Sequence, residues 1–239
     1  DAAALRTRAE RTNEGWKLNG TKAFISGGGY SDAYVVMVRT GGDGPKGIST
    51  VVVESDAPGL SFGKLEDKMG WRAQPTRQVQ FDDCLTPLDN IVGEEGRGFT
   101  YAMVGLDGGR LNISACALGG AQAALDRTLV YMGERKAFGK TIDQFQALQF
   151  RLADMATQIA VARQMVHHAA ALREAGRPAL VEASMAKLFA SEMAERVCSA
   201  AIQTLGGYGY LSDFPVERMM RDAKITQIYE GTNQIQRVV

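Results

Sequence analysis

The chain has 239 residues, 45% of them hydrophobic and 23% charged, which is enough for one large domain or two ordinary domains with hydrophobic cores. Its 27 basic residues balance its 27 acidic residues, so the net charge gives no sign of binding to nucleic acid or to an anionic membrane surface. Three widely separated cysteines, Cys84, Cys116 and Cys198, form no C-x-x-C pair, which indicates a reducing compartment and argues against zinc, and no apolar stretch is long enough to span a bilayer.

Short strands are predicted up to about residue 97. Residues 5–9 and 16–18 alternate between apolar and polar side chains, and Asn19-Gly20 is a hairpin signal between two such runs. Further strand candidates, separated by Gly, Pro and Asp turns, cover residues 33–38, 48–53 and 78–81. This pattern predicts an antiparallel β-barrel or β-sandwich domain over residues 1–97.

Helical periodicity replaces the strand pattern after residue 97. One helix has an apolar stripe at three-four spacing, and the next has a stripe of small residues that lets neighbouring helices approach closely. The four predicted helices cover residues 98–136, 148–169, 183–201 and 215–228. We therefore expect an α+β protein in which an antiparallel four-helix bundle over residues 98–239 follows the β domain.

Two motifs that often mark functional sites are incomplete. Gly27-Gly28-Gly29 follows a predicted strand, but no helix with G-x-G-x-x-G or G-K-[ST] comes after it, so we expect a flexible turn rather than a phosphate site. His167 and His168 are the only histidines, and neighbours on a helix point about 100° apart, so they cannot both bind one metal ion. No metal site and no Ser/His/Asp catalytic site is expected.

The most informative stretch is residues 229–234, where the helical pattern breaks at a Gly followed by Thr and Asn. Glu230 stands at this break, with no Lys or Arg within five residues on either side. A carboxylate beside an aromatic wall can be desolvated, which raises its pKa toward neutrality, as a general base requires. Most Glu residues at helix ends are solvated caps, so on these residues alone a cap and a base both remain open.

Four segments of the sequence are similar to motifs of a known enzyme family: KAFIS at 22–26, ERKAFGK at 134–140, QTLGGYG at 203–209 and IYEGTNQ at 228–234. Their order and spacing resemble those of the acyl-CoA dehydrogenase family, from its middle β domain through its C-terminal four-helix domain. The resemblance covers essentially the whole chain. Within the family, three shorter segments are similar to the branch that acts on isobutyryl-CoA, at residues 44–49, 74–77 and 184–190.

The resemblance implies α,β-dehydrogenation of a short or branched acyl-CoA to the 2-enoyl-CoA, with FAD as cofactor. Glu230 matches the base that removes the α-proton while the β-hydrogen leaves as hydride to flavin N5, and its backbone N–H would bind the thioester carbonyl. Tyr229 and Gly231 match substrate-contacting positions beside the base. Phe24 and Ser26 match the strand beside the flavin, where many members carry Trp and Thr, so we expect retained flavin binding in an altered environment.

Further positions match binding roles, with those for the adenylate and pyrophosphate coming from a neighbouring subunit. They are Arg135, Phe138 and Gln146 at the adenylate end of FAD, Gln203, Gly206 and Gly207 at the pyrophosphate, Thr232 and Gln234 as FAD contacts after the base, and Asp107 and Arg110 at the CoA part of the substrate. Arginine suits that last task because its planar fork binds carbonyl and phosphate oxygens.

The family also implies a homotetramer or dimer of dimers, electron-transferring flavoprotein as electron acceptor, and the bacterial cytoplasm or the mitochondrial matrix as location. Asp1 resembles the end of a Gly-Ser-Asp signature, so we expect an upstream helical domain and first β segment that complete the flavin and acyl sites. An acyl-CoA oxidase of the same fold stays open, whereas flavin monooxygenase relatives generally lack the glutamate. A non-catalytic helical scaffold is the third alternative.

Overall fold

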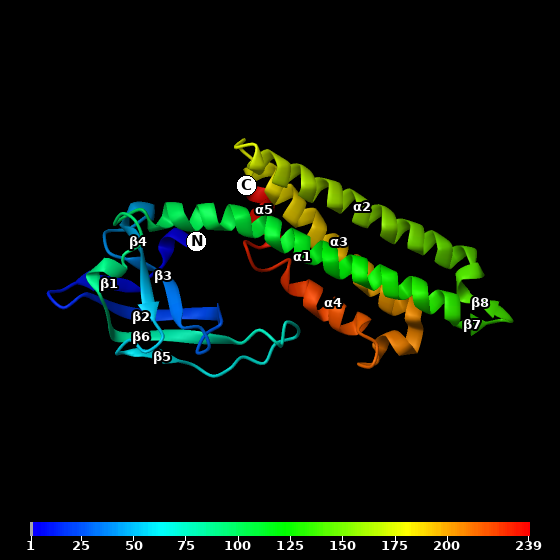
Figure 1. The fold of residues 1–239 in the computed structure, drawn as a ribbon, viewed down its shortest axis with the longest axis horizontal. Helices are drawn as coiled ribbons and strands as arrows, with labels where there is room; N and C mark the ends of the chain where they lie inside the picture. Colours follow the sequence, from blue (N-terminus) through cyan, green and yellow to red (C-terminus); the bar gives the residue numbers. More distant parts are fainter. Residues whose placement is uncertain (1) are drawn as a thin grey trace. The chain divides into compact units, whose positions relative to one another are not determined.

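The computed structural model of the chain describes residues 2–239, and Asp1, the expected end of the Gly-Ser-Asp signature, lies outside the described residues. The chain divides into two compact units, residues 1–105 and 106–239. The six-stranded sheet lies in the first unit, and the second unit is mainly helical (Figure 1). The α+β class predicted from the change in periodicity near residue 97 is thereby confirmed.

The first unit contains a single six-stranded sheet with the strand order β4-β3-β1-β2-β6-β5. Its strands are β1 (Arg8–Arg11), β2 (Trp16–Ser26), β3 (Ala33–Arg39), β4 (Ile48–Glu54), β5 (Leu60–Phe62) and β6 (Thr76–Thr86). Alternating apolar residues of these strands form one buried cluster that includes Trp16, Leu18, Val38 and Val53. Short 3-10 helices flank the strands at η1 (Ala2–Ala4), η2 (Pro45–Gly47) and η3 (Leu88–Asn90).

The sheet departs from the expected antiparallel arrangement at one junction, because β3 lies beside β1 and runs parallel to it. The physical reason is connectivity. β1 and β2 form an antiparallel pair, and the next reversal of the chain brings β3 back in the direction of β1, on the free edge of β1. The other four junctions are antiparallel.

The hairpin predicted at Asn19-Gly20 is wrong. Both residues lie inside the continuous strand β2, at a register shift between β2 and β6. The hairpin lies earlier, where the hydroxyl of Thr12 donates to the carbonyl of Gly15 and accepts from its amide, at 2.9 and 3.2 Å. A Thr side chain that bonds the backbone two or three residues on is itself a turn signal.

The second unit is built from helices that run alongside one another (Figure 1). They are α1 (Gly98–Glu134), α2 (Gln146–Glu174), α3 (Leu180–Leu205), α4 (Val216–Ile225) and the unpredicted short α5 (Asn233–Val238). The expected stripes are buried: Met155, Ile159 and Ala162 on α2 pack with Ala186 and Ala190 on α3 in one core cluster. The four long helical patterns were therefore read correctly.

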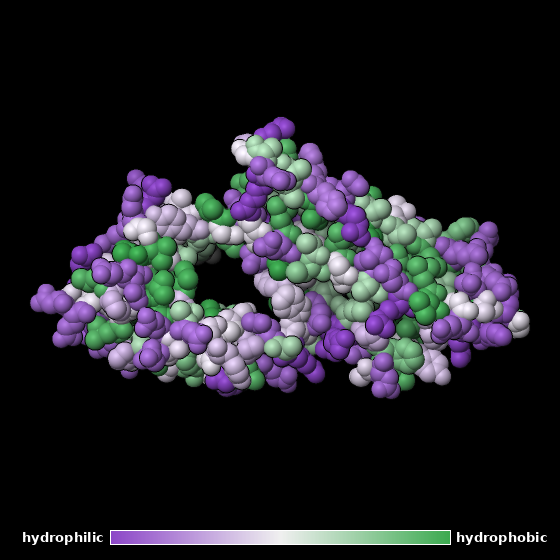
Figure 2. Space-filling model, in the orientation of Figure 1, coloured by the Kyte–Doolittle hydropathy of each residue, from purple (hydrophilic) through white to green (hydrophobic). Residues whose placement is uncertain are grey.

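Short elements join these helices. A hairpin of β7 (Lys136–Ala137) and β8 (Lys140–Thr141) and the 3-10 helix η4 (Ile142–Gln144) connect α1 to α2, and η5 (Gly206–Tyr210) follows α3. Figure 2 shows apolar side chains exposed among polar ones along the helices, and Leu129 and Val130 on α1 are 49% and 63% exposed. No helix within residues 2–239 combines the length and the apolar character needed to cross a bilayer.

Candidate active site

Glu230 lies in the turn between α4 and α5, with its backbone in the left-handed region at φ 55°. Gly231 follows at φ 82°, a conformation that glycine adopts without strain. For other residues the left-handed region costs of order 1 kcal/mol or more and persists only where the surroundings enforce it. Within residues 2–239 only five non-glycine residues have positive φ, and three of them, Phe24, Phe138 and Glu230, were picked out from the sequence as site residues.

Buried polar side chains hold this turn. Lys187, on α3 and fully buried, donates from Nζ to the carbonyl of Gly231 at 2.8 Å and to Oδ1 of Asn233 at 3.0 Å. Gln236, also buried, donates from Nε2 to the carbonyls of Glu230 and Gly231 at 3.1 and 3.0 Å. The backbone carbonyls of Glu230 and Gly231 are therefore held by side chains of α3 and α5.

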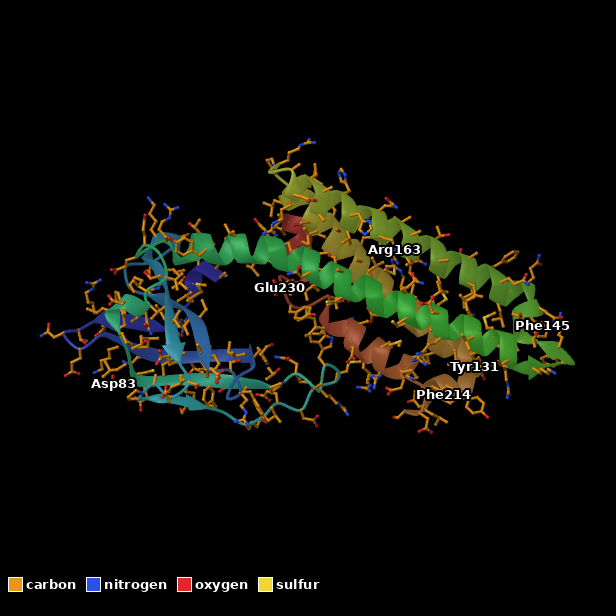
Figure 3. All side chains as sticks on the ribbon, viewed as in Figure 1. Asp83, Tyr131, Phe145, Arg163, Phe214 and Glu230 are labelled. Carbon is orange, nitrogen blue, oxygen red and sulfur yellow. The ribbon has the colours of Figure 1, made fainter. Side chains whose placement is uncertain are left out.

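The carboxylate of Glu230 points at α1, where a glycine makes room for it. A Cβ placed on Gly109 would lie 2.1 Å from Oε2 of Glu230, closer than any real contact allows. The next residue of α1, Arg110, is buried and forms an ion pair with Asp107 at 2.9 Å, while its Nε, also buried, has no hydrogen-bond partner within residues 2–239. Figure 3 shows Glu230 beside α1.

The electrostatics suit a base. Burial raises the pKa of Glu230 above its ordinary value, and the positive charges of Lys187 and Arg110 oppose that rise. Burial lowers the pKa of Lys187 to about 8, against the opposing influence of Glu230. Burial, with contributions from Cys116 and Glu230, raises the pKa of the Tyr229 phenol, which therefore stays neutral beside the carboxylate at ordinary pH.

The turn singled out from the sequence has no Lys or Arg within five residues along the chain, but basic side chains that are distant in the sequence lie near its carboxylate. The cations come from other helices, Arg110 from α1 and Lys187 from α3. Arg110 was identified through the family resemblance, whereas Lys187, Gly109 and Gln236 were missed. One signal existed for Lys187: it stands at helical spacing within the stripe of small residues and so falls on the buried face of α3.

A second group of expected residues meets at another place in the same unit. Arg135, Gly206 and Gly207 line an open cavity of about 660 Å³ together with Tyr208, and the guanidinium of Arg135 lies 5.7 Å from the centre of the Tyr208 ring. No atom lies within 4 Å of a Cβ placed on Gly206 or Gly207, so a ligand can approach their backbone. A cation beside two glycines with open space around them fits a phosphate.

The neighbouring positions are more exposed. Phe138 forms the tip of the β7–β8 hairpin with Gly139, both at positive φ, and is 95% exposed. Gln146, exposed, is the first residue of α2. Gln203 is separate from Gly206 and Gly207 and lines another cavity, of about 760 Å³, with residues of α2, α3 and α4. In Figure 3, Phe145 and Tyr131 mark this end of the helical unit, opposite the end where Glu230 lies.

The remaining expected positions divide between the two units. Phe24 lies in the first unit at a bulge of β2, 80% exposed, and Ser26 ends the strand and pairs with Thr76 of β6. In the second unit Thr232 caps α5 by accepting from the amide of Ile235 at 3.4 Å, while Gln234 is exposed in the first turn of that helix. Nowhere in residues 2–239 do three or more His, Cys, Asp or Glu side chains gather as a metal site would require.

Comparisons with known proteins agree with this arrangement. Residues 1–84 match the family described as "Acyl-CoA dehydrogenase, middle domain", and residues 96–239 match "Acyl-CoA dehydrogenase, C-terminal domain". The chain belongs to the acyl-CoA dehydrogenase family.

Similar proteins share both sequence and fold. A mitochondrial isobutyryl-CoA dehydrogenase of Bos taurus is 51% identical over all of this chain and 58% of its own length, and an acryloyl-CoA reductase (NADH) of Anaerotignum propionicum is 49% identical over all of this chain and 61% of its own. The structure of butyryl-CoA dehydrogenase from Megasphaera elsdenii has a TM-score of 0.97 and 46% identity, covering 100% of this chain and 63% of that one. The chain thus spans about three fifths of the length of these relatives.

Proposed function

We propose that the protein is an FAD-dependent dehydrogenase that converts a short or branched acyl-CoA, such as isobutyryl-CoA, to the 2-enoyl-CoA. One observation carries the proposal: Glu230 is a partly buried carboxylate with a raised pKa, held on a strained turn whose neighbours fix both its backbone and its charge. A general base works best when its pKa lies near the working pH, and strain of this kind persists where function needs it.

The residues around Glu230 have separate tasks in this proposal. Glu230 takes the α-proton of the acyl thioester onto its carboxylate, which is anionic before the transfer and neutral after it. Arg110, whose buried Nε retains an unused N–H, would hold an oxygen of the substrate, and its charge would stabilise the enolate that develops. FAD, when bound, supplies the two-electron acceptor for the β-hydrogen.

The residues at the other end fit the phosphates of FAD but are too far from Glu230 to hold the same cofactor within one chain. From Gly109 to the end of α1, next to Arg135, the helix extends roughly 40 Å at about 1.5 Å per residue. An extended FAD molecule is shorter than that. This separation supports a flavin site shared between subunits, with Arg135, Gly206 and Gly207 serving the flavin of a neighbouring copy in a homotetramer or dimer of dimers.

A reductase is the second candidate function, because identity to the acryloyl-CoA reductase, 49%, is close to the 51% identity to the isobutyryl-CoA dehydrogenase. The two relatives differ in the direction in which electrons flow, so direction has to be measured. For the dehydrogenase, electrons would pass to electron-transferring flavoprotein in the bacterial cytoplasm or the mitochondrial matrix. NADH oxidation that depends on acryloyl-CoA would favour the reductase instead.

The decisive test of the base is Glu230→Gln, assayed in the flavin-bound holoenzyme. We expect the variant to keep its yellow flavin and to lose reductive bleaching by isobutyryl-CoA, at a cost of at least about 10² to 10⁴ in rate, because shape is kept and basicity is lost. Glu182→Gln, in the first turn of α3, is the matched control and should bleach normally. Near-normal bleaching of Glu230→Gln would show that Glu230 is not the base.

A panel of acyl-CoA esters tests the substrate. We expect isobutyryl-CoA to give a higher kcat/KM for flavin reduction than butyryl-CoA or octanoyl-CoA, and a clear preference for longer straight chains would defeat that assignment. Comparing anaerobic with aerobic reoxidation of the substrate-reduced protein separates a dehydrogenase from an oxidase. A full-length protein that is colourless when purified would favour the non-catalytic scaffold.

A further inference from the structure

Lys187 is an unusual residue in the second unit because its side chain is completely buried in a helical core. Lysine is almost never fully buried unless its ammonium group is paired or hydrogen-bonded. Small residues are buried near it on the same helix, among them Ala183, Ala186 and Ala190, and its ammonium reaches the turn after α4. The ammonium therefore ends under the Glu230 turn and away from water.

Two acceptors occupy the ammonium, and both belong to the turn. They are the carbonyl of Gly231, at 2.8 Å, and Oδ1 of Asn233, at 3.0 Å. Asn233 is itself buried and exchanges hydrogen bonds with Ser191, one turn further along α3, at 3.1 and 3.2 Å. Two successive turns of α3 thus hold the segment immediately after Glu230 through side chains.

No ion pair within 4.0 Å joins Lys187 to Glu230 in the described part of the chain, so the ammonium does not occupy the carboxylate oxygens. The ammonium is close enough to act on it through space, together with Arg110 of α1, while Tyr229 is the neutral titratable neighbour. A cation that lies near a carboxylate without contacting it favours the ionised form, and it leaves the carboxylate oxygens free to accept a proton.

We propose that Lys187 is a positioning residue for the base: its ammonium fixes the left-handed Glu230-Gly231 turn through Gly231 and Asn233 and places a positive charge near the Glu230 carboxylate without bonding to it. The inference rests on the proposed function, in which Glu230 removes the proton. A buried lysine with a purely structural role would need hydrogen-bond acceptors, but these could lie anywhere in the fold. This lysine is placed so that both of its acceptors follow the base within three residues.

The test uses Lys187→Met in the holoenzyme, a change that keeps length and apolar packing but removes the charge and the donors. We expect full flavin content, a decrease of about tenfold to hundredfold in the rate of flavin reduction by isobutyryl-CoA at pH 7, and a shift of the acidic limb of the pH–rate profile to higher pH. The shift has this sign because removing a nearby cation raises the pKa of Glu230 further. Lys224→Met, a partly exposed lysine of α4, is the control and should leave the profile unchanged.

Asn233→Ala is the second variant and removes one acceptor while leaving the charge of Lys187 in place. We expect a slower reduction of about fivefold to tenfold with an unmoved acidic limb, so this variant carries the test of the positioning role if Lys187→Met does not fold. A Lys187→Met protein with a normal rate and profile, or an Asn233→Ala protein with a normal rate, overturns the proposal. If Glu230→Gln is also active, the proposed function itself has failed, whereas an inactive Glu230→Gln beside a normal Lys187→Met refutes only the role of Lys187.

Discussion

Replacing Gly109 by alanine should separate the position of the base from the stability of the fold. Gly109 lies inside α1, where glycine destabilises a helix by about 0.5 to 1 kcal/mol relative to alanine. Its φ is not in the left-handed region, so conformation does not require glycine there. What requires it is the Glu230 carboxylate, since the new Cβ would lie 2.1 Å from Oε2 and 2.8 Å from Cδ.

The size of the effect follows from those distances. Ordinary contact with a Cβ begins at 3.4 Å, so the carboxylate has to retreat by roughly 1 Å. The retreating atoms are the end of a flexible side chain, so the backbone and the helix packing can stay in place. A displacement of about 1 Å of a reacting group costs up to about 10² in rate. Gly109→Ala should therefore be as stable as the wild type or slightly more stable, and about tenfold to hundredfold slower.

Anaerobic stopped-flow reduction of the bound flavin by isobutyryl-CoA measures the rate, and flavin content and thermal unfolding measure integrity. Gly119→Ala is the matched control, because Gly119 lies on the same helix with no atom within 4 Å of the added Cβ. It should gain the same helix stability and keep the wild-type rate. A Gly109→Ala protein that reduces its flavin as fast as Gly119→Ala would show that the carboxylate does not work from the position beside α1.

Two further predictions concern stability. Burial lowers the pKa of Lys187 from 10.5 to about 8, so the cost of burying its charge is fully present below pH 8 and is lost as the pH rises toward 10.5. Between pH 7 and pH 10 the free energy of unfolding of the wild type should therefore rise by roughly 2 to 3 kcal/mol relative to that of Lys187→Met, as measured by urea unfolding followed by circular dichroism. An unchanged difference between the two proteins would contradict a buried charged lysine. Gly209→Ala should lower the free energy of unfolding by about 1 to 3 kcal/mol, and with it the thermal midpoint, because the new Cβ would lie 2.6 Å from the backbone carbonyl oxygen of Ile202. Gly133→Ala is the control, because there is open space around its Cβ, and its midpoint should not fall. Equal midpoints for the two variants would refute the steric argument.

Periodicity predicted the fold well where one face of an element is buried. The stripe on α2 and the small residues on α3 both face the core, as the three-four spacing requires. The local turn signal failed at Asn19-Gly20, although its glycine has a real structural role. Gly20 has φ 140°, and a Cβ there would lie 2.8 Å from Cα of Thr7, so the residue permits a close backbone approach inside a bulged strand. Sequence alone cannot tell that need from the need of a hairpin.

Only part of the candidate site could be predicted from the sequence, for a related reason. A break in a helical pattern is local, and it marked the turn that carries Glu230. The groups that give Glu230 its properties, Gly109 and Arg110 on α1 and Lys187 on α3, are separated from it by long stretches of chain. Only the packing of α1 and α3 against the turn brings them together, and no periodicity encodes which residues of two helices meet.

Taken singly, each feature around Glu230 reduces stability. A non-glycine residue in the left-handed region, a carboxylate whose pKa is raised by burial, a fully buried lysine and a glycine inside a long helix all cost free energy. A fold that needed only stability would replace the glycine with alanine and the lysine with an apolar side chain, changes that can be neutral or stabilising. These costs meet at one carboxylate, and the glycine and the lysine each serve it, one by leaving space and one by supplying charge and hydrogen bonds. Independent stability costs that coincide at a single acidic group are better explained by chemistry at that group than by folding.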